Sequence, residues 1–120
     1  MRALGLYEGM ASDLNPLRED ILAYTTSPAG SHGTAMEAYY FARHCFLKPQ
    51  QIRDHMSVIQ HIPTVILQGQ NDMICPPAGA YNLHAALPQS TLHIVPACGH
   101  RATPAMEALR VAVLDALIGP

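Results

Sequence analysis

The stretch of sequence that decides the fold runs from residue 64 to residue 76 and reads TVILQGQNDMICP. Its first part, Thr64 to Gln68, is β-branched and continuously hydrophobic, which is typical of a parallel strand covered on both faces. Its second part, Gly69 to Pro76, is a loop that contains one acid, Asp72. In open α/β sheets, functional groups collect on the loops that follow the carboxyl ends of the strands. The stretch therefore indicates an α/β fold with an ionisable group at a strand end.

The same arrangement occurs once more downstream. Thr91 to Val95 is a second apolar strand, and Gly99 and His100 follow it closely. The residues from Pro77 to Leu87 are expected to form a helix between the strands, and an amphipathic helix over residues 104–118 closes the chain. This order of strand, loop and helix, repeated twice, predicts two parallel strands joined by a right-handed crossover.

The segment before the first strand carries helical patterns. We expect a short helix that ends at Tyr24, capped by Asp13 or Asn15, and then a loop over Thr25 to Gly33, where proline and glycine interrupt the pattern.

A further helix is expected over Ala35 to Phe46, with Thr34 as its cap and Glu37 at the third position, which is the arrangement of a capping box. Gln50 to Gln60 is expected to form another short helix before Pro63. The sequence thus predicts a helical segment over residues 1–60 and an α/β segment over residues 61–120.

The composition excludes several classes of function. The chain has 120 residues, 13% of them charged, and a formal net charge of -2, without a Lys/Arg cluster that would bind nucleic acid. Three widely spaced cysteines indicate neither a disulfide framework nor a zinc ribbon and favour a reduced, cytoplasmic setting. No run approaches the roughly 20 apolar residues of a membrane span. The seven histidines form no HxxxH pair, so we expect no metal and no cofactor.

Asp72 and His100 are the candidate chemical groups. Adjacent parallel strands lie roughly 5 Å apart, so the two side chains can reach hydrogen-bond distance although 28 residues separate them. Asp72 would then hold the ring of His100 in one tautomer and stabilise the imidazolium that forms when His100 accepts a proton. The alternative is structural, since an aspartate in a turn often bonds only nearby backbone.

The residues around both loops resemble a known family. Asp72 to Pro76, the helix with Asn82 to His84, the strand Leu92 to Pro96 and the pair Gly99 and His100 are similar to the C-terminal part of proline iminopeptidases. These are serine aminopeptidases of the α/β-hydrolase fold. The resemblance extends roughly from residue 35 to residue 117, and it implies release of N-terminal proline from peptides through an acyl-enzyme on serine.

The resemblance also implies roles for individual residues. Asp72 corresponds to the acid and His100 to the base of a catalytic triad, and Glu37 to a cap-domain glutamate that receives the free amino group of the substrate. Tyr40 and Phe41 would line an apolar pocket for proline. From the residues alone, Glu37 is equally well a helix cap, and an aromatic run on a helix is more often core.

Cys75 lies three residues after the acid, where the resemblance implies a thiol near the site. A small buried side chain with a structural role is the alternative for this residue. Arg101 departs from the small residue that the family tends to place after the histidine. Close to His100, its charge would disfavour the protonated ring.

A nucleophile is missing from the pattern. The chain has no Gly-x-Ser-x-Gly elbow, and the GSHG sequence at residues 30–33 has the wrong spacing and no preceding strand. We therefore expect a C-terminal fragment, with a helical cap-domain remnant over residues 1–60 and the C-terminal hydrolase lobe over residues 61–120. Such a chain is inactive alone, and its partner is the missing N-terminal lobe of the hydrolase.

Two other interpretations stay open. The chain is a part of another α/β hydrolase, such as an esterase or an epoxide hydrolase, or it is a non-catalytic assembly module derived from one. The absent nucleophile and the unpaired edge of a two-stranded sheet favour the assembly module, whereas Glu37 and the Asp-x-x-Cys-Pro sequence from Asp72 favour the peptidase.

Overall fold

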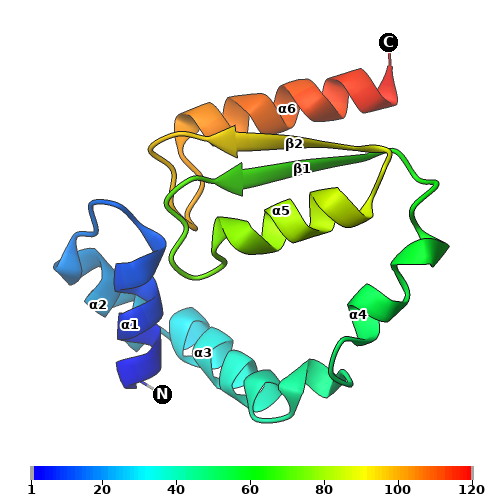
Figure 1. The fold of residues 1–120 in the computed structure, drawn as a ribbon. Helices are drawn as coiled ribbons and strands as arrows, with labels where there is room; N and C mark the ends of the chain where they lie inside the picture. The colour runs from blue at the N-terminus through cyan, green and yellow to red at the C-terminus, as the bar shows by residue number, and fades with distance from the viewer. Residues whose placement is uncertain (1, 120) are drawn as a thin grey trace.

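The computed structural model describes residues 2–119. Its C-terminal half is a parallel pair of strands between two helices, in the order β1 (Thr64–Gly69), α5 (Pro77–Ala86), β2 (Ser90–Val95) and α6 (Pro104–Ile118). Figure 1 shows α5 along one side of the strand pair and α6 along the other. The predicted α/β fold class and the parallel pairing are confirmed.

The register of the strands makes their carboxyl ends level. Thr64 pairs with Ser90 at the start of the sheet, and Gly69 pairs with Val95 at its end. Both loops that follow therefore leave the sheet at the same height. The core beneath them is small, and its buried side chains are Ala80, Leu87, Val95 and Cys98.

The observed ends of α6 agree with those predicted from the sequence. Pro104 occupies the first turn, where its missing N–H costs no hydrogen bond, and the Thr103 hydroxyl accepts a hydrogen bond from the N–H of Met106 at 3.4 Å. The observed bounds, Pro104–Ile118, match the predicted helix.

The N-terminal half consists of three packed helices, α1 (Arg2–Ser12), α2 (Arg18–Thr26) and α3 (Pro28–Phe41). In Figure 1, α1 and α2 lie beyond the arrowheads of β1 and β2, on the side of the two strand-end loops, and α3 lies beside them below α5. After α3 the chain passes through η1 (His44–Phe46), α4 (Gln51–Asp54) and η2 (Met56–Val58) before it enters β1.

The loop predicted over Thr25 to Gly33 is wrong, because α3 begins at Pro28. Ser27 caps this helix, and its hydroxyl accepts from the N–H of Gly30 at 3.1 Å. Gly30 serves close packing instead of a turn: a Cβ there would lie 2.1 Å from the carbonyl oxygen of Tyr24. The loop was predicted because glycine often interrupts a helix, but Gly30 instead allows two helices to touch.

The predicted capping box is also wrong. Thr34 lies inside α3, and its hydroxyl donates to the carbonyl of Gly30 at 2.9 Å. Glu37 is therefore not at the start of a helix. The helix ends at Phe41 and not at Phe46, because His44, Cys45 and Phe46 have φ angles of 51°, 53° and 58°, which a right-handed helix cannot contain.

Two smaller predictions differ as well. Neither Asp13 nor Asn15 caps α2, since Leu17 precedes it and Asp13 Oδ1 accepts from the N–H of Asn15 at 3.2 Å. The single helix predicted over residues 50–60 is divided into α4 and η2. The helix α1 had no counterpart among the predicted elements.

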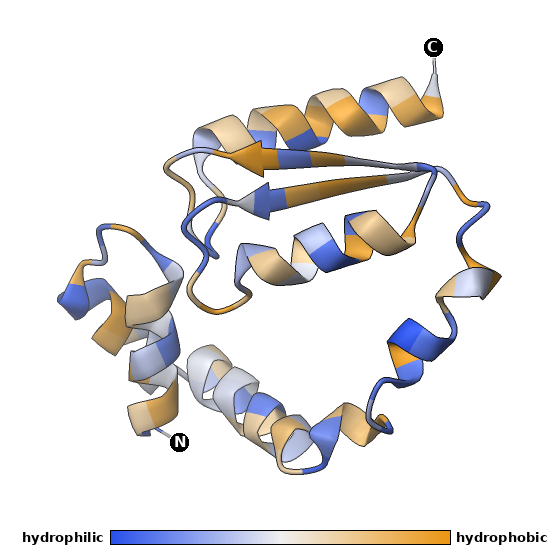
Figure 2. Ribbon diagram, in the orientation of Figure 1, coloured by the Kyte–Doolittle hydropathy of each residue, from blue (hydrophilic) through white to orange (hydrophobic). Residues whose placement is uncertain are grey.

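Apolar residues remain at the surface of the C-terminal half. Figure 2 shows hydrophobic residues along both strands and along α6. On α6, Val111, Leu114, Leu117 and Ile118 are exposed. Among residues 2–119, no helix is long and apolar enough to cross a membrane.

Candidate active site

Two strand-end loops meet at the carboxyl edge of the sheet. The N–H of Gln70 donates to the carbonyl of Val95, and the N–H of Asn71 donates to that of Cys98, both at 2.9 Å. Gly69 makes this contact possible, since a Cβ on it would lie 2.3 Å from the carbonyl oxygen of Gly99. The two loops thus form one hydrogen-bonded unit that fixes the backbone around Asp72 and His100.

Within this unit, Asp72 Oδ2 lies 3.0 Å from His100 Nδ1. Asp72 is 8% exposed, whereas the side chain of His100 is 44% exposed. The predicted proximity of the two residues is confirmed. Because a carboxylate accepts and does not donate, the proton lies on Nδ1, and Nε2 is left as the free proton acceptor.

The pKa of Asp72 is lowered from its ordinary value of 3.8. Burial by itself would raise this pKa. Hydrogen bonds from the N–H of Cys75, the ring of His100 and the N–H of Ile74, together with the charge on His100, outweigh that effect. Asp72 is therefore ionised at neutral pH and is held in one orientation.

The two cysteines near the loops differ in environment. Cys75 is exposed, and its sulfur lies within 4.8 Å of ligand atoms of both Asp72 and His100. The structure thus brings it next to the pair, as the resemblance implies, and the alternative of a buried side chain is wrong. Cys98 is fully buried, and its sulfur lies 3.6 Å from the carbonyl oxygen of Gly99. Cys98 packs beneath the loops.

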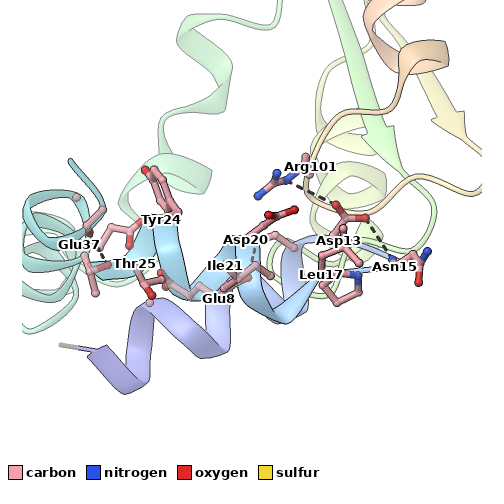
Figure 3. Close-up of a pocket in the computed structure, with 17 residues that line it drawn as sticks. Glu8, Asp13, Asn15, Leu17, Asp20, Ile21, Tyr24, Thr25, Glu37 and Arg101 are labelled. Carbon is pink, nitrogen blue, oxygen red and sulfur yellow. Dashed lines mark hydrogen bonds and ion pairs between the residues drawn. The ribbon is translucent and has the colours of Figure 1, made fainter. Parts of the chain in front are cut away.

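A cavity of about 520 Å³ lies between the N-terminal helices and the loop after β2 (Figure 3). Its ionisable lining residues are Glu8, Asp13, Asp20, Tyr24, Glu37 and Arg101. The carboxylates outnumber the one guanidinium, so the cavity attracts cations.

Glu37 lines this cavity together with Glu8, a residue that sequence reasoning missed. The pKa of Glu8 is raised above its ordinary value of 4.5 by burial, then by a side-chain hydrogen bond with Glu37 and by the charge of Glu37. The charge of His100 acts in the opposite direction and is the smallest of these influences on the pKa of Glu8. Asp72 and His100 line a different cavity, of about 260 Å³, which neither glutamate lines.

Glu8 approaches Glu37 because α1 packs closely on its neighbours. A Cβ on Gly5 would lie 2.8 Å from Thr34 Oγ1, and one on Gly9 would lie 2.4 Å from Ile21 Cγ2. The spacing of Gly5 and Gly9, one helical turn apart, was the signal in the sequence for a closely packed helix with Glu8 on it.

Arg101 connects the helical half to the site. Its N–H donates to the carbonyl of Ser12 at 2.8 Å, and its Nε lies 3.7 Å from Asp13 Oδ2. Figure 3 shows the side chain directed at Asp13. Arg101 thus pairs with an acid, and its contacts hold the end of α1 against the loop that carries His100.

Tyr40 and Phe41 lie about one helical turn after Glu37 on α3. Both are exposed, at 46% and 56%, and neither lines the cavity with Glu37. The ring of Tyr40 instead contacts that of Phe46 edge to face at a centroid distance of 5.3 Å. Tyr40 belongs to an aromatic group with Tyr39 and Phe46 near the C-terminal end of α3.

The chain is similar to known proteins of one family. The alpha/beta hydrolase fold family model matches residues 2–102. A "Probable proline iminopeptidase" from Leptolyngbya boryana is 43% identical over 84 residues, which are 69% of this chain and 24% of that protein. The proline iminopeptidase of Xylella fastidiosa (strain Temecula1) is 36% identical over 104 residues, 84% of this chain and 33% of that protein.

The proline iminopeptidase of Arabidopsis thaliana is 32% identical over 102 residues, 84% of this chain and 27% of that protein. The chain thus spans between a quarter and a third of the length of these relatives.

Proposed function

This chain belongs to the α/β-hydrolase fold family, and we propose that it carries the acid and the base of a serine hydrolase that releases N-terminal proline from peptides. The observation that carries the proposal is the 3.0 Å contact between Asp72 Oδ2 and His100 Nδ1. The similarity to proteins named proline iminopeptidases supports the substrate class.

In this proposal, His100 transfers the protons of an acyl-transfer reaction, and Asp72 orients it. Ionised Asp72 holds the Nδ1–H of His100, so that Nε2 accepts the proton of the serine hydroxyl as the serine attacks the carbonyl of the proline. The imidazolium that forms is stabilised by Asp72. It then gives the same proton to the leaving amine, and a water molecule repeats the sequence on the acyl-enzyme.

Glu8 and Glu37 bind the amino end of the substrate. The N-terminal nitrogen of a peptide that begins with proline is a secondary ammonium with two N–H donors and one positive charge. Two carboxylates can accept both hydrogens, and charge-assisted hydrogen bonds of this kind are about twice as strong as neutral ones. The bound cation also removes the repulsion that raises the pKa of Glu8. A substrate with a blocked nitrogen lacks these contacts.

The serine comes, in this proposal, from a part of the hydrolase outside the 120 residues. No Gly-x-Ser-x-Gly sequence is present among them, and a triad without its nucleophile retains only residual catalysis. The partner is thus the missing N-terminal lobe of the hydrolase. It would cover the apolar residues that α6 exposes, and this chain alone would not hydrolyse peptides.

A chimera tests the proposal. The 104 matched residues of the Xylella fastidiosa protein are replaced by the corresponding residues of this chain, and release of p-nitroaniline from proline p-nitroanilide is measured. We expect activity that His100→Ala lowers by about 10⁴-fold or more and that His61→Ala, at an exposed histidine before β1, leaves unchanged.

The blocked substrate N-acetylproline p-nitroanilide provides the second comparison, and we expect no cleavage of it. A folded chimera that cleaves neither compound would refute the proposal. Equal cleavage of both would refute the role of Glu8 and Glu37 and would favour a less selective α/β hydrolase, such as an esterase.

A further inference from the structure

Asp72, Cys75 and His100 offer three different ligand atoms on one surface. A carboxylate oxygen, a sulfur and a ring nitrogen lie within 4.8 Å of one another. We propose that this cluster is an inhibitory Zn²⁺ site, in which the ion enters between Asp72 and His100 and takes Cys75 as its third ligand. Binding of the ion stands on the geometry alone, whereas inhibition rests on the proposed function.

The spacing of the atoms suits a tetrahedral ion. Zinc holds oxygen and nitrogen ligands at about 2.0–2.1 Å and sulfur at about 2.3 Å, so neighbouring ligand atoms lie about 3.3–3.6 Å apart. Asp72 Oδ2 and His100 Nδ1 are already 3.0 Å apart. Cys75 is exposed, and rotation about its single χ1 bond can bring the sulfur closer.

The backbone around the ligands is held in place without the ion. Asp72 Oδ1 accepts from the N–H of Ile74 at 2.9 Å and from the N–H of Cys75 at 2.7 Å, so the metal would bind Oδ2 and replace its hydrogen bond from His100 Nδ1. The carbonyl of Cys75 in turn accepts from Gln68 Nε2 at 3.1 Å. Hydrogen bonds of this kind orient the ligands of metal sites and increase their affinity.

The chemistry of the donors selects the ion. One thiolate and one carboxylate neutralise a divalent charge, and the imidazole adds a neutral ligand. A mixed set of sulfur, nitrogen and oxygen suits Zn²⁺, whereas Mg²⁺ and Ca²⁺ require mainly oxygen. Three protein ligands leave the fourth tetrahedral position to water. The ligands come from two loops, so the spacing of the histidines along the chain does not indicate the site.

Zinc on His100 Nδ1 would stop proton transfer. Coordination replaces the proton on Nδ1, so the neutral ring must carry its proton on Nε2. Cys75 releases its thiol proton to solvent as the Zn–S bond forms. Nε2 then has no lone pair to accept the proton of a serine, and Asp72 is bound to the ion. The site would therefore switch the hydrolase off while Zn²⁺ is bound.

Metal binding is tested on the 120-residue chain with Co²⁺ as a spectroscopic probe and Zn²⁺ as its competitor. We expect one Co²⁺ per chain, with the thiolate-to-cobalt charge-transfer band and the intense visible bands of a tetrahedral ion, and displacement by one equivalent of Zn²⁺. Cys75→Ser should abolish the charge-transfer band and weaken Zn²⁺ binding at least 10-fold. Cys45→Ser, at the other exposed cysteine, should change neither.

A measurement on the unchanged chain supplements the variants. Zn²⁺, but not Mg²⁺, should protect Cys75 from alkylation and leave Cys45 reactive, as mapped by mass spectrometry. A charge-transfer band that survives in Cys75→Ser, or equal alkylation of Cys75 with and without Zn²⁺, would overturn the metal site.

Inhibition is measured on the chimera as the ratio of activity with and without Zn²⁺. We expect a loss of activity that a chelator reverses and that is at least 10-fold weaker in Cys75→Ser than in Cys45→Ser. Binding without loss of activity would overturn the inhibitory role alone. A chimera without activity in the absence of Zn²⁺ would refute the proposed function, and the cobalt spectrum would still decide whether the metal site exists.

Discussion

Replacement of Gly69 by alanine tests how closely the two strand-end loops must pack. A Cβ on this residue would lie 2.3 Å from the carbonyl oxygen of Gly99 and 2.7 Å from that of Cys98. Carbon atoms and their non-bonded neighbours prefer separations of about 3.5 Å, so the loops must part by about 1 Å. Backbone atoms cannot rotate away as side chains do. We therefore expect Gly69→Ala to lower the free energy of unfolding by about 1–3 kcal/mol.

The same displacement acts on the site. Asp72 and His100 lie on the two loops that part, and their contact is 3.0 Å. A separation larger by about 1 Å breaks this hydrogen bond and can reduce catalysis by about 10²-fold. In the isolated chain, the loss should appear by NMR as disappearance of the downfield signal of the Nδ1 proton of His100.

Urea unfolding followed by circular dichroism measures the change in stability. Gly79→Ala is the matched control, because this glycine lies inside α5 and a Cβ on it would have no neighbour within 4 Å. We expect the control to be more stable than the wild type by about 0.5–1 kcal/mol. Two alanine variants that change stability in the same direction would refute the reasoning, as would a Gly69→Ala chain that keeps the His100 signal.

Three further predictions concern stability. The folded state lowers the pKa of Asp72, so the ionised carboxylate stabilises the fold above the ordinary value of 3.8, and this stabilisation is lost at lower pH. Asp72→Asn should therefore lower the free energy of unfolding by about 1–2 kcal/mol at pH 7. Urea unfolding that shows the same loss in acid would contradict this. The folded state raises the pKa of Glu8 above 4.5, so ionisation of Glu8 destabilises the fold. Glu8→Gln should therefore raise the free energy of unfolding by about 0.5 kcal/mol at pH 7 and have no such effect below pH 4.5. Thermal melts in which the variant is less stable at pH 7 would contradict this prediction. Cys98 is fully buried, so Cys98→Ser should lower the free energy of unfolding by about 1–3 kcal/mol through an added buried hydroxyl; unchanged urea midpoints would disprove that.

The C-terminal half could be predicted from the sequence because its signals are local. The apolar run from Thr64 to Gln68 and the one from Thr91 to Val95 identify the strands, and Pro104 marks the start of α6. The proximity of Asp72 and His100 then follows from the parallel order of the strands. The one further assumption is the distance of roughly 5 Å between adjacent strands of a sheet.

The N-terminal half could not be predicted to the same degree because its glycines serve contacts between helices. Gly30 packs on the carbonyl of Tyr24, and Gly5 and Gly9 allow α1 to approach its neighbours. A single sequence does not distinguish a glycine that breaks a helix from one that lets two helices touch. The carboxylate pair of Glu8 and Glu37 depends on this tertiary packing, so Glu37 was identified by resemblance and Glu8 was missed.

Proton transfer by His100 depends most on its orientation by Asp72. The most direct measurement is kcat/KM for proline p-nitroanilide of the chimera with Asp72→Asn, compared with Asp115→Asn at an exposed aspartate on α6. The amide preserves the shape of the side chain but favours the wrong ring tautomer, so we expect a loss on the order of 10⁴-fold in a folded protein and no loss in the control. A loss of less than tenfold for Asp72→Asn would contradict the account.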